Sequence, residues 1–277
     1  MLKRNEIRIR DPFILTDRDE GCYYMYGTTA LVESSIRAKD SFSVYKSYDL
    51  ENFFEPVTVF CGSDIGFWAD RDFWAPEVHK YNGKYYLFGS CKAEGKCRGT
   101  QIFVSDTPSG VFTPISDGPI TPGDWECLDG ILWVEDGIPY IVFSHEWVQV
   151  KDGEICAMAL SEDLKTAVGE PFILFKASDC KDVSEIREGS GNYVTDGPFF
   201  YREDGVLKMI WSSFYRGRYL VLGAESDSLH GEWKHTGSKF DFDGGHAMIF
   251  DSLEGKRFIS LHSPNTSGLE RAKFFEF

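Results

Sequence analysis

The chain has 277 residues, a net charge of −15, 42% hydrophobic residues and 16% aromatic residues. An acidic surface of this kind argues against a nucleic-acid or anionic-membrane partner, because both attract basic surfaces. No low-complexity linker divides the chain, and no apolar stretch approaches the length of a membrane span. We therefore expect one soluble domain over residues 1–277, with enough aromatic residues to build a core and also to line a cleft.

The seven cysteines are odd in number and irregularly spaced, and no C-x-x-C pair occurs among them. A structural zinc site is therefore not expected, and buried free thiols in a reducing compartment are the simplest interpretation. Pairing of Cys91 with Cys97 across a loop is the alternative. The N-terminus lacks the apolar core of a secretory signal. The expectation is a cytoplasmic protein, or an exported one whose leader has been removed.

A short motif recurs five times along the chain, about 50 to 70 residues apart. Each copy is followed by a short apolar strand, a turn and a second strand rich in aromatic residues. When the copies are aligned, three aspartates and a histidine fall in one register. The aligned positions are Asp11, Ala75, Asp129, Asp196 and His246. Periods of this size, with several strands in each, are typical of radial β arrays.

Helical patterns are nearly absent, and the expected strands are separated by turn-forming dipeptides. Examples are Asn82-Gly83, Asp136-Gly137, Asp152-Gly153, Asp204-Gly205 and Glu254-Gly255. In the second repeat, strands are expected near 76–81, 84–90, 101–105 and 111–115. A four-stranded meander repeated five times predicts an all-β fold, the five-bladed β-propeller. The last repeat ends before a clear fourth strand, and residues 2–9 are the candidate to complete it.

Equivalent positions of a closed array converge at its axis, so Asp11, Asp129 and Asp196 are expected to meet there, with His246 beside them. A single aspartate before a strand is most often a turn former. Three at one axis need another explanation, because carboxylates brought together cannot all ionise at low cost. Such clusters usually have shifted pKa values and take part in acid–base chemistry.

The same face is expected to carry the ends of the second strands, because neighbouring strands of a meander are antiparallel. Paired carboxylates are the equipment of glycoside hydrolysis, and aromatic side chains beside them suit stacking against sugar rings. Each aromatic residue alone is more readily explained as part of the core, and for Arg216 an exposed loop position is an equally good explanation. The candidates for substrate binding are Trp74, Trp147, Arg216, Phe73 and His145.

With its motifs in this order, the chain resembles glycoside hydrolase family 43 from about residue 10 to the C-terminus. The matching segments are Arg10-Asp11-Pro12-Phe13-Ile14, Trp74-Ala75-Pro76-Glu77-Val78, Leu128-Asp129-Gly130, Thr195-Asp196-Gly197-Pro198-Phe199 and Gly244-Gly245-His246-Ala247. Each segment is short, but five in order on a five-unit repeat are specific. The resemblance implies a five-bladed propeller that hydrolyses glycosidic bonds with inversion and has a carbohydrate as its partner.

The resemblance also assigns roles to the carboxylates. It makes Asp11 the general base and Asp129 the residue that raises the pKa of the acid and orients it. The family typically has Glu at the acid position, whereas this chain has Asp196, which is one methylene shorter. Asp196 is the first candidate for the acid and Glu146 the second, and Glu77 or a loss of activity is the remaining alternative.

According to the same resemblance, no cofactor is required for the chemistry, and His246 helps to hold a hydrated metal ion, commonly calcium, on the axis. The expected activity is that of an exo-acting α-L-arabinofuranosidase on plant-type glycans or oligosaccharides, followed by β-xylosidase and β-galactofuranosidase. A non-catalytic carbohydrate-binding propeller is the rival of another class, and the intact Asp11 and Asp129 argue against it. A phosphorylase would need more basic residues on this face than Lys92 and Arg216.

Overall fold

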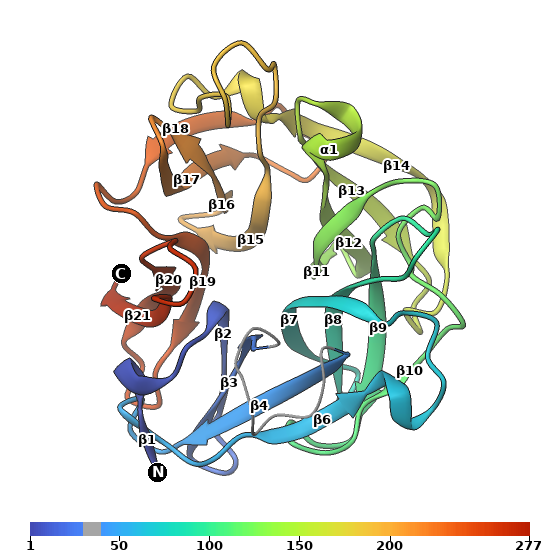
Figure 1. Cartoon of the computed structure of the whole chain (residues 1–277), viewed down its shortest axis with the longest axis vertical. Coiled ribbons are helices and arrows are strands. Elements are labelled where there is room, and N and C mark those ends of the chain that lie inside the picture. The colour runs from blue at the N-terminus through green and yellow to red at the C-terminus, as the bar shows by residue number, and fades with distance from the viewer. Residues whose placement is uncertain (30–39) are drawn as a thin grey trace.

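The computed structural model describes residues 1–29 and 40–277, which form five antiparallel sheets around a central axis (Figure 1). The sheets follow one another in chain order, so the colours of Figure 1 run once around the ring. We call these sheets blades 1 to 5. The predicted five-bladed β-propeller is confirmed.

Blade 1 has the strand order β1-β5-β4-β3-β2, with β6 paired to β4. Its strands are β1 (Leu2–Lys3), β2 (Arg10–Asp17), β3 (Cys22–Thr28), β4 (Ser41–Ser47), β5 (Asn52–Phe53) and β6 (Val57–Cys61). Blade 2 is a meander of β7 (Arg71–Tyr81), β8 (Lys84–Lys92), β9 (Gly99–Ser105) and β10 (Thr113–Pro114).

Blades 3 to 5 repeat the meander, although the last has three strands within the described residues. Blade 3 contains β11 (Cys127–Glu135), β12 (Ile138–His145), β13 (Glu154–Leu160) and β14 (Ala167–Lys176), with the short helix α1 (Trp147–Val150) after β12. Blade 4 contains β15 (Asp196–Glu203), β16 (Val206–Tyr215), β17 (Arg218–Ser226) and β18 (Lys234–Ser238). Blade 5 contains β19 (Gly245–Asp251), β20 (Arg257–Ser263) and β21 (Arg271–Glu276).

Three of the predicted turn dipeptides close two-residue hairpins between the first and second strands of their blades. They are Asn82-Gly83, Asp136-Gly137 and Asp204-Gly205. Both residues of each hairpin have positive φ, for example 47° at Asn82 and 78° at Gly83. Type I′ turns require this geometry, and Asn, Asp and Gly adopt it most readily. Asp152-Gly153 is different, because it joins α1 to β13 and closes no hairpin.

A β-bulge at the start of each blade shows which residues are equivalent. The ladder between the first two strands shifts after the pairs Arg10↔Thr28, Trp74↔Ser90, Leu128↔Ser144, Asp196↔Ser212 and Gly245↔His262. The next residue has positive φ each time: 54° at Asp11, 44° at Ala75, 56° at Asp129, 51° at Gly197 and 51° at His246. The predicted register is therefore wrong by one residue in blade 4. Gly197 is the equivalent of Asp11, and Asp196 is the equivalent of Arg10, Trp74 and Leu128.

Polar side chains tie these bulges to the preceding blade. In three cases the backbone N–H donates to a hydroxyl at the end of a second strand, at 2.7–2.9 Å: Ala75 to Thr28, Asp129 to Ser90 and His246 to Ser212. Where the ring closes, the N–H of Asp11 donates to Nδ1 of His262 at 3.2 Å. A bulge removes its residue from the ladder, and these bonds satisfy the backbone donor that would otherwise be buried without a partner.

The N-terminal segment closes the ring differently from our expectation. Leu2 and Lys3 pair with β5 of blade 1, so the prediction that they complete blade 5 is wrong. Farther along the segment, Arg8 makes an isolated antiparallel bridge to Arg271 of β21, and the N–H of Ile9 donates to the carbonyl of Glu270 at 3.3 Å. The N-terminal segment therefore links blades 1 and 5, although it adds no full strand to blade 5.

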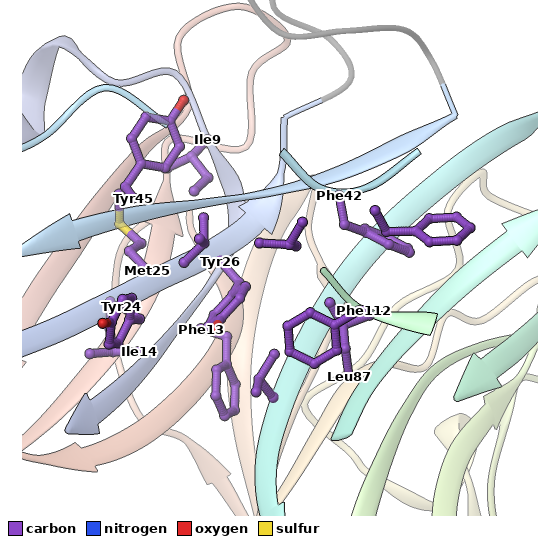
Figure 2. Packing of buried hydrophobic residues seen from close by; sticks show 14 of the residues in the cluster. Ile9, Phe13, Ile14, Tyr24, Met25, Tyr26, Phe42, Tyr45, Leu87 and Phe112 are labelled. Carbon is purple, nitrogen blue, oxygen red and sulfur yellow. The ribbon is translucent and has the colours of Figure 1, made fainter. Parts of the chain in front are cut away.

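Apolar residues pack between the blades and hold them at fixed angles. Figure 2 shows part of the cluster that joins blade 1 to its neighbours, including Phe13, Tyr26 and Phe42. Phe73 of β7 belongs to the same cluster, with its ring centroid 5.2 Å from that of Phe42. Burying one such ring stabilises the fold by about 1.5–3 kcal/mol. These contacts fix the strand ends that meet at the axis.

All seven cysteines are free thiols, including Cys91 and Cys97. None of the helices in the described part of the chain is both long and apolar enough to cross a membrane.

Candidate active site

The bulges of the five blades surround a cavity of about 350 Å³. Every blade contributes to its wall, as expected for a site at the axis of a propeller. The lining residues are Arg10, Asp11, Thr28, Trp74, Leu128, Asp129, Glu146, Trp147, Asp196, Tyr219, His246, Ser267 and Glu270. All four residues predicted to be catalytic are therefore in one cavity.

Asp11 is buried, and polar side chains surround its carboxyl group. Its Oδ2 accepts a hydrogen bond of 2.6 Å from the Thr28 hydroxyl, and its Oδ1 lies 3.3 Å from the Nδ1 atoms of both His246 and His262. Burial alone would raise the pKa of Asp11, but His246, His262 and the neighbouring Arg10 outweigh it. Together they hold the pKa of this carboxyl well below its usual range, so Asp11 is an ionised carboxylate at neutral pH.

Asp129 has the opposite electrostatic environment. Burial and the nearby charge of Asp11 raise its pKa well above the ordinary value. Its Oδ2 accepts a hydrogen bond of 2.8 Å from the backbone N–H of Gly197. Gly197 cannot be replaced easily, because its φ is +51° and an added Cβ would lie 2.9 Å from the ring of His246. Asp129 therefore fixes the peptide bond that joins Asp196 to Gly197.

Asp196 lines the cavity from the position just before the bulge of blade 4. Its Oδ2 accepts a hydrogen bond of 3.0 Å from the hydroxyl of Tyr219. Burial, followed by the charge of Asp129, raises the pKa of Asp196 to about 8, although His246 and Tyr219 act in the opposite direction. At neutral pH, Asp196 is therefore mainly a neutral carboxylic acid.

Glu146 directly follows β12 of blade 3 and is held by an ion pair. Its Oε2 accepts a hydrogen bond from Nη1 of Arg98, whose Nη2 donates to Oδ2 of Asp72 at 2.8 Å. The guanidinium carbon of Arg98 also lies 4.2 Å from the ring centroid of Trp74. Burial raises the pKa of Glu146, whereas Arg98 opposes this shift. The network makes Glu146 part of a rigid wall.

Glu77, the remaining alternative for the acid, is buried and does not line the cavity. Its Oε2 lies 3.5 Å from Nε2 of His79, and neither atom has a hydrogen-bond partner among the described residues. Burial raises the pKa of Glu77 to about 8. Glu77 therefore does not face a bond bound in the cavity.

Two of the five predicted substrate-binding residues line the cavity, namely Trp74 and Trp147. The other three do not, and their predicted positions are corrected. Phe73 is 1% exposed, because the residue before Trp74 points to the opposite face of the strand and into the core. His145 is buried against Trp125, and its Nδ1 lies 3.0 Å from Oε2 of Glu154. Arg216 lies on an exposed turn, with its guanidinium over the ring of Tyr215.

Arg10, Leu128 and Tyr219 line the cavity but were not predicted from the sequence. Arg10 and Leu128 precede their bulges, like Trp74 and Asp196, so the corrected register identifies them. Tyr219 lies at the start of β17, the third strand of its blade. The antiparallel argument already places that part of each blade on the active face.

His246 was expected to help hold a hydrated calcium ion on the axis. Its Nδ1 lies 3.3 Å from Oδ1 of Asp11 and 3.6 Å from Oδ2 of Asp129. Calcium takes about six to eight oxygen ligands. Within residues 1–29 and 40–277, no group of three or more His, Cys, Asp and Glu side chains is arranged to hold a metal ion. These side chains do not fit a calcium ion held directly by a set of protein ligands, and Nδ1 of His246 lies beside the carboxyl groups of Asp11 and Asp129 instead.

The chain is similar to solved structures of enzymes that act on carbohydrates. An endo-arabinase from Bacteroides thetaiotaomicron VPI-5482 is 40% identical with a TM-score of 0.91, and the match covers 100% of this chain and 96% of that chain. An α-L-arabinofuranosidase from Lactobacillus brevis is 17% identical with a TM-score of 0.77, over 100% of this chain and 94% of that chain. At that identity, the second match shows the fold alone.

Comparison with curated proteins and with family models agrees with this result. The extracellular endo-alpha-(1->5)-L-arabinanase 1 of Bacillus subtilis (strain 168) is 24% identical over 158 residues, or 53% of this chain and 46% of that protein. Xylosidase/arabinosidase 43A of Humicola insolens is 30% identical over 80 residues, or 29% of this chain and 24% of that protein. Both matches thus span less than half of the relative. The family model described as Glycosyl hydrolases family 43 matches residues 5–275, and the chain therefore belongs to this family, as its motifs indicated.

Proposed function

We propose that this protein hydrolyses a glycosidic bond with inversion, using Asp11 as general base and Asp196 as general acid. One observation carries the proposal: a single cavity holds two carboxyl groups whose pKa values are shifted in opposite directions. Against the effect of burial, His246, His262 and Arg10 keep Asp11 ionised, whereas burial and Asp129 raise the pKa of Asp196 to about 8. A carboxylate and a carboxylic acid facing one substrate are the two groups that this reaction needs.

In the proposed reaction, the carboxylate of Asp11 accepts a proton from a water molecule while the water oxygen attacks the anomeric carbon. Asp196 donates its proton to the glycosidic oxygen as the bond between that oxygen and the anomeric carbon breaks. The leaving sugar departs as an alcohol, and the released sugar has the inverted configuration. Proton exchange with solvent then returns Asp11 to the ionised form and Asp196 to the protonated form.

Asp129 would support the acid in two ways. Its carboxyl group contributes electrostatically to the raised pKa of Asp196, and its Oδ2 accepts a hydrogen bond from the backbone N–H of Gly197, the residue next to the acid. An aspartate has less reach than the family's glutamate, so the position of its backbone matters more. The hydrogen bond from Tyr219 orients the same carboxyl group.

Glu146 is less suited to the acid role than Asp196. Its Oε2 is engaged by the guanidinium of Arg98, so protonation there would break a buried ion pair. In the proposal, Glu146 therefore shapes the cavity beside Trp74 and Trp147. Removing its charge should weaken substrate binding without removing the proton donor.

The proposed substrate is a terminal α-L-arabinofuranosyl group of a plant-type glycan or oligosaccharide. Arabinose-linked activities are named for the endo-arabinase, the endo-arabinanase and the xylosidase/arabinosidase to which this chain is similar. The cavity volume of about 350 Å³ is at the small end of ligand pockets, which span roughly 300–1,000 Å³, and this favours cleavage near a chain end. Internal cleavage of arabinan is the second candidate, because the endo-arabinase is 40% identical over the whole chain.

Nitrophenyl α-L-arabinofuranoside, β-xyloside and β-galactofuranoside, together with linear arabinan, test the proposal. We expect turnover of the arabinofuranoside and release of single arabinose units from arabinan. Release of a ladder of oligosaccharides would instead identify an endo-acting enzyme, and preferred turnover of another glycoside would reassign the sugar. Binding of arabinan without any turnover would identify a carbohydrate-binding propeller.

Variants of the carboxyl groups test the mechanism with the same substrates. We expect Asp11→Asn and Asp196→Asn to lose most activity, by about 10²–10⁴-fold for a group that transfers a proton. Glu146→Gln should retain the greater part of kcat. Full activity in Asp11→Asn would contradict the mechanism, and activity in Asp196→Asn with none in Glu146→Gln would reassign the acid. Proton NMR of the first-formed anomer distinguishes inversion from retention.

A further inference from the structure

A second cavity, of about 660 Å³, adjoins the catalytic one between blades 2 and 3. Trp74 and Glu146 line both cavities, and beyond this shared wall the second cavity is lined by Lys92, Glu126 and Val148. We propose that it binds the second sugar unit of the substrate, that this unit is neutral, and that Lys92 and Glu126 recognise its hydroxyl groups. The proposal rests on the glycosidase function proposed above.

The wall between the two cavities is rigid. The guanidinium of Arg98 packs 4.2 Å from the ring centroid of Trp74 and donates hydrogen bonds to Glu146 and to Asp72. Arg98 itself is 8% exposed. A sugar chain that crosses from one cavity to the other would therefore pass a surface whose side chains already have fixed positions. Binding then costs little ordering of the protein.

The far side of the second cavity is also held in place. Gln149 of α1 accepts a hydrogen bond of 2.8 Å from the backbone N–H of Glu126, and its Nε2 donates to the carbonyl of Asp124 at 2.9 Å. His145, stacked on Trp125 with ring centroids 4.1 Å apart, lies 2.9 Å from Oε1 of Gln149. His145 therefore supports Gln149 from behind the cavity wall and does not contact substrate. Gln149 in turn anchors the backbone of Glu126 at the cavity.

Lys92 and Glu126 have the chemistry to bind a hydroxyl group. The Nζ of Lys92 donates to both carboxylate oxygens of Glu126 at 2.8 Å, and the two side chains are 27% and 18% exposed. A lysine ammonium has three N–H donors, and the carboxylate oxygens have lone pairs beyond those used here. The pair therefore presents a donor next to an acceptor. A sugar hydroxyl, which both donates and accepts, matches this arrangement.

The charge balance of the second cavity favours a neutral sugar over a uronic acid. Lys92 is paired with Glu126, while Arg98 is paired with both Glu146 and Asp72. The two cations are thus outnumbered by three carboxylates, and neither cation has an unpaired charge to offer an acidic group. A carboxylate on the second sugar would meet net negative charge, which disfavours its binding.

The test blocks the second cavity without disturbing its ion pairs. Val148 lines the second cavity and is 54% exposed, so Val148→Trp can fill space there without affecting the core. Val168, on the outer strand of the same blade, is 55% exposed and lines neither cavity, so Val168→Trp is the matched control. The probes are α-1,5-linked arabinobiose as substrate and free arabinose as a competitive inhibitor of the first cavity.

We expect Val148→Trp to raise the KM for arabinobiose about tenfold, as loss of the contacts to one sugar unit implies, with little change in kcat. Lys92→Met should raise it about 3- to 10-fold, as loss of a hydrogen bond implies. Inhibition by arabinose should remain as in wild type, and Val168→Trp should behave as wild type throughout. An unchanged KM for arabinobiose in Val148→Trp would overturn the second-sugar site.

Failure of the proposed function gives a different result. In that case the wild-type protein itself does not cleave arabinobiose. Calorimetric binding of arabinobiose to wild type and to Val148→Trp then tests the cavity alone. Weaker binding to the variant supports the second-sugar site, and equal or absent binding to both proteins overturns it.

Discussion

Replacing Asp196 with Asn should make the protein less active and, at neutral pH, more stable. The pKa of Asp196 is raised from 3.8 to about 8 in the folded protein by burial and by Asp129. The unfolded chain therefore loses this proton near pH 4, whereas the folded protein keeps it until about pH 8. Stability from this group is fully present below pH 4 and falls as the pH rises toward 8. Asn has the same shape and no proton to lose.

The size of the expected change in stability follows from the pKa shift of Asp196. One pKa unit corresponds to about 1.4 kcal/mol, so the upper limit at pH 7 is about 4 kcal/mol. Because Asp129 shares the same charge cluster, we expect about half of this limit. For a chain of this size, a change of that order corresponds to an increase in Tm of roughly 4–8 °C.

Differential scanning calorimetry of wild type and Asp196→Asn from pH 4 to pH 8 measures this effect. We expect the two melting temperatures to be close near pH 4 and to separate as the pH rises, with the variant more stable. The basic limb of the wild-type pH–activity profile, near pH 8, should be absent from any residual activity of the variant. A difference in Tm that does not change with pH, or a variant with full activity, would refute the assignment of a protonated Asp196.

Three further predictions concern the groups around the acid and the core. Tyr219→Phe removes a hydrogen bond that favours the ionised form of Asp196, so the basic limb of the kcat/KM profile should move to higher pH. A basic limb that stays in place or moves to lower pH would contradict this. Gly197→Ala places a Cβ 2.9 Å from the ring of His246 at a φ of +51°, and should cost at least 1–2 kcal/mol of stability and most of the activity, as urea unfolding and turnover would measure. Phe73→Ala should destabilise the fold by about 3–5 kcal/mol in the same unfolding experiment, and a change below 1 kcal/mol would contradict its place in the core.

The turns and strands that depend on neighbouring residues were predicted correctly from the sequence. The hairpins at Asn82-Gly83 and Asp136-Gly137 depend on the positive φ that these residue types tolerate, and neighbours in the sequence suffice to specify them. The fivefold repeat of motifs, combined with antiparallel pairing, was enough to predict the propeller and to place Asp11, Asp129 and Trp74 at one cavity.

The tertiary structure decided what depends on pairing between strands and packing between blades. A bulge inserts one residue, and its position depends on the partner strand, so the sequence alone could not show that Gly197 rather than Asp196 is the counterpart of Asp11. Packing against another blade places Phe73 in the core, although the residue after it lines the cavity. Arg98 lies 48 residues from Glu146, and their ion pair exists only because blades 2 and 3 bring the two side chains together. Local periodicity thus located the active face, whereas the protonation state and rigidity of its residues depend on contacts between distant segments.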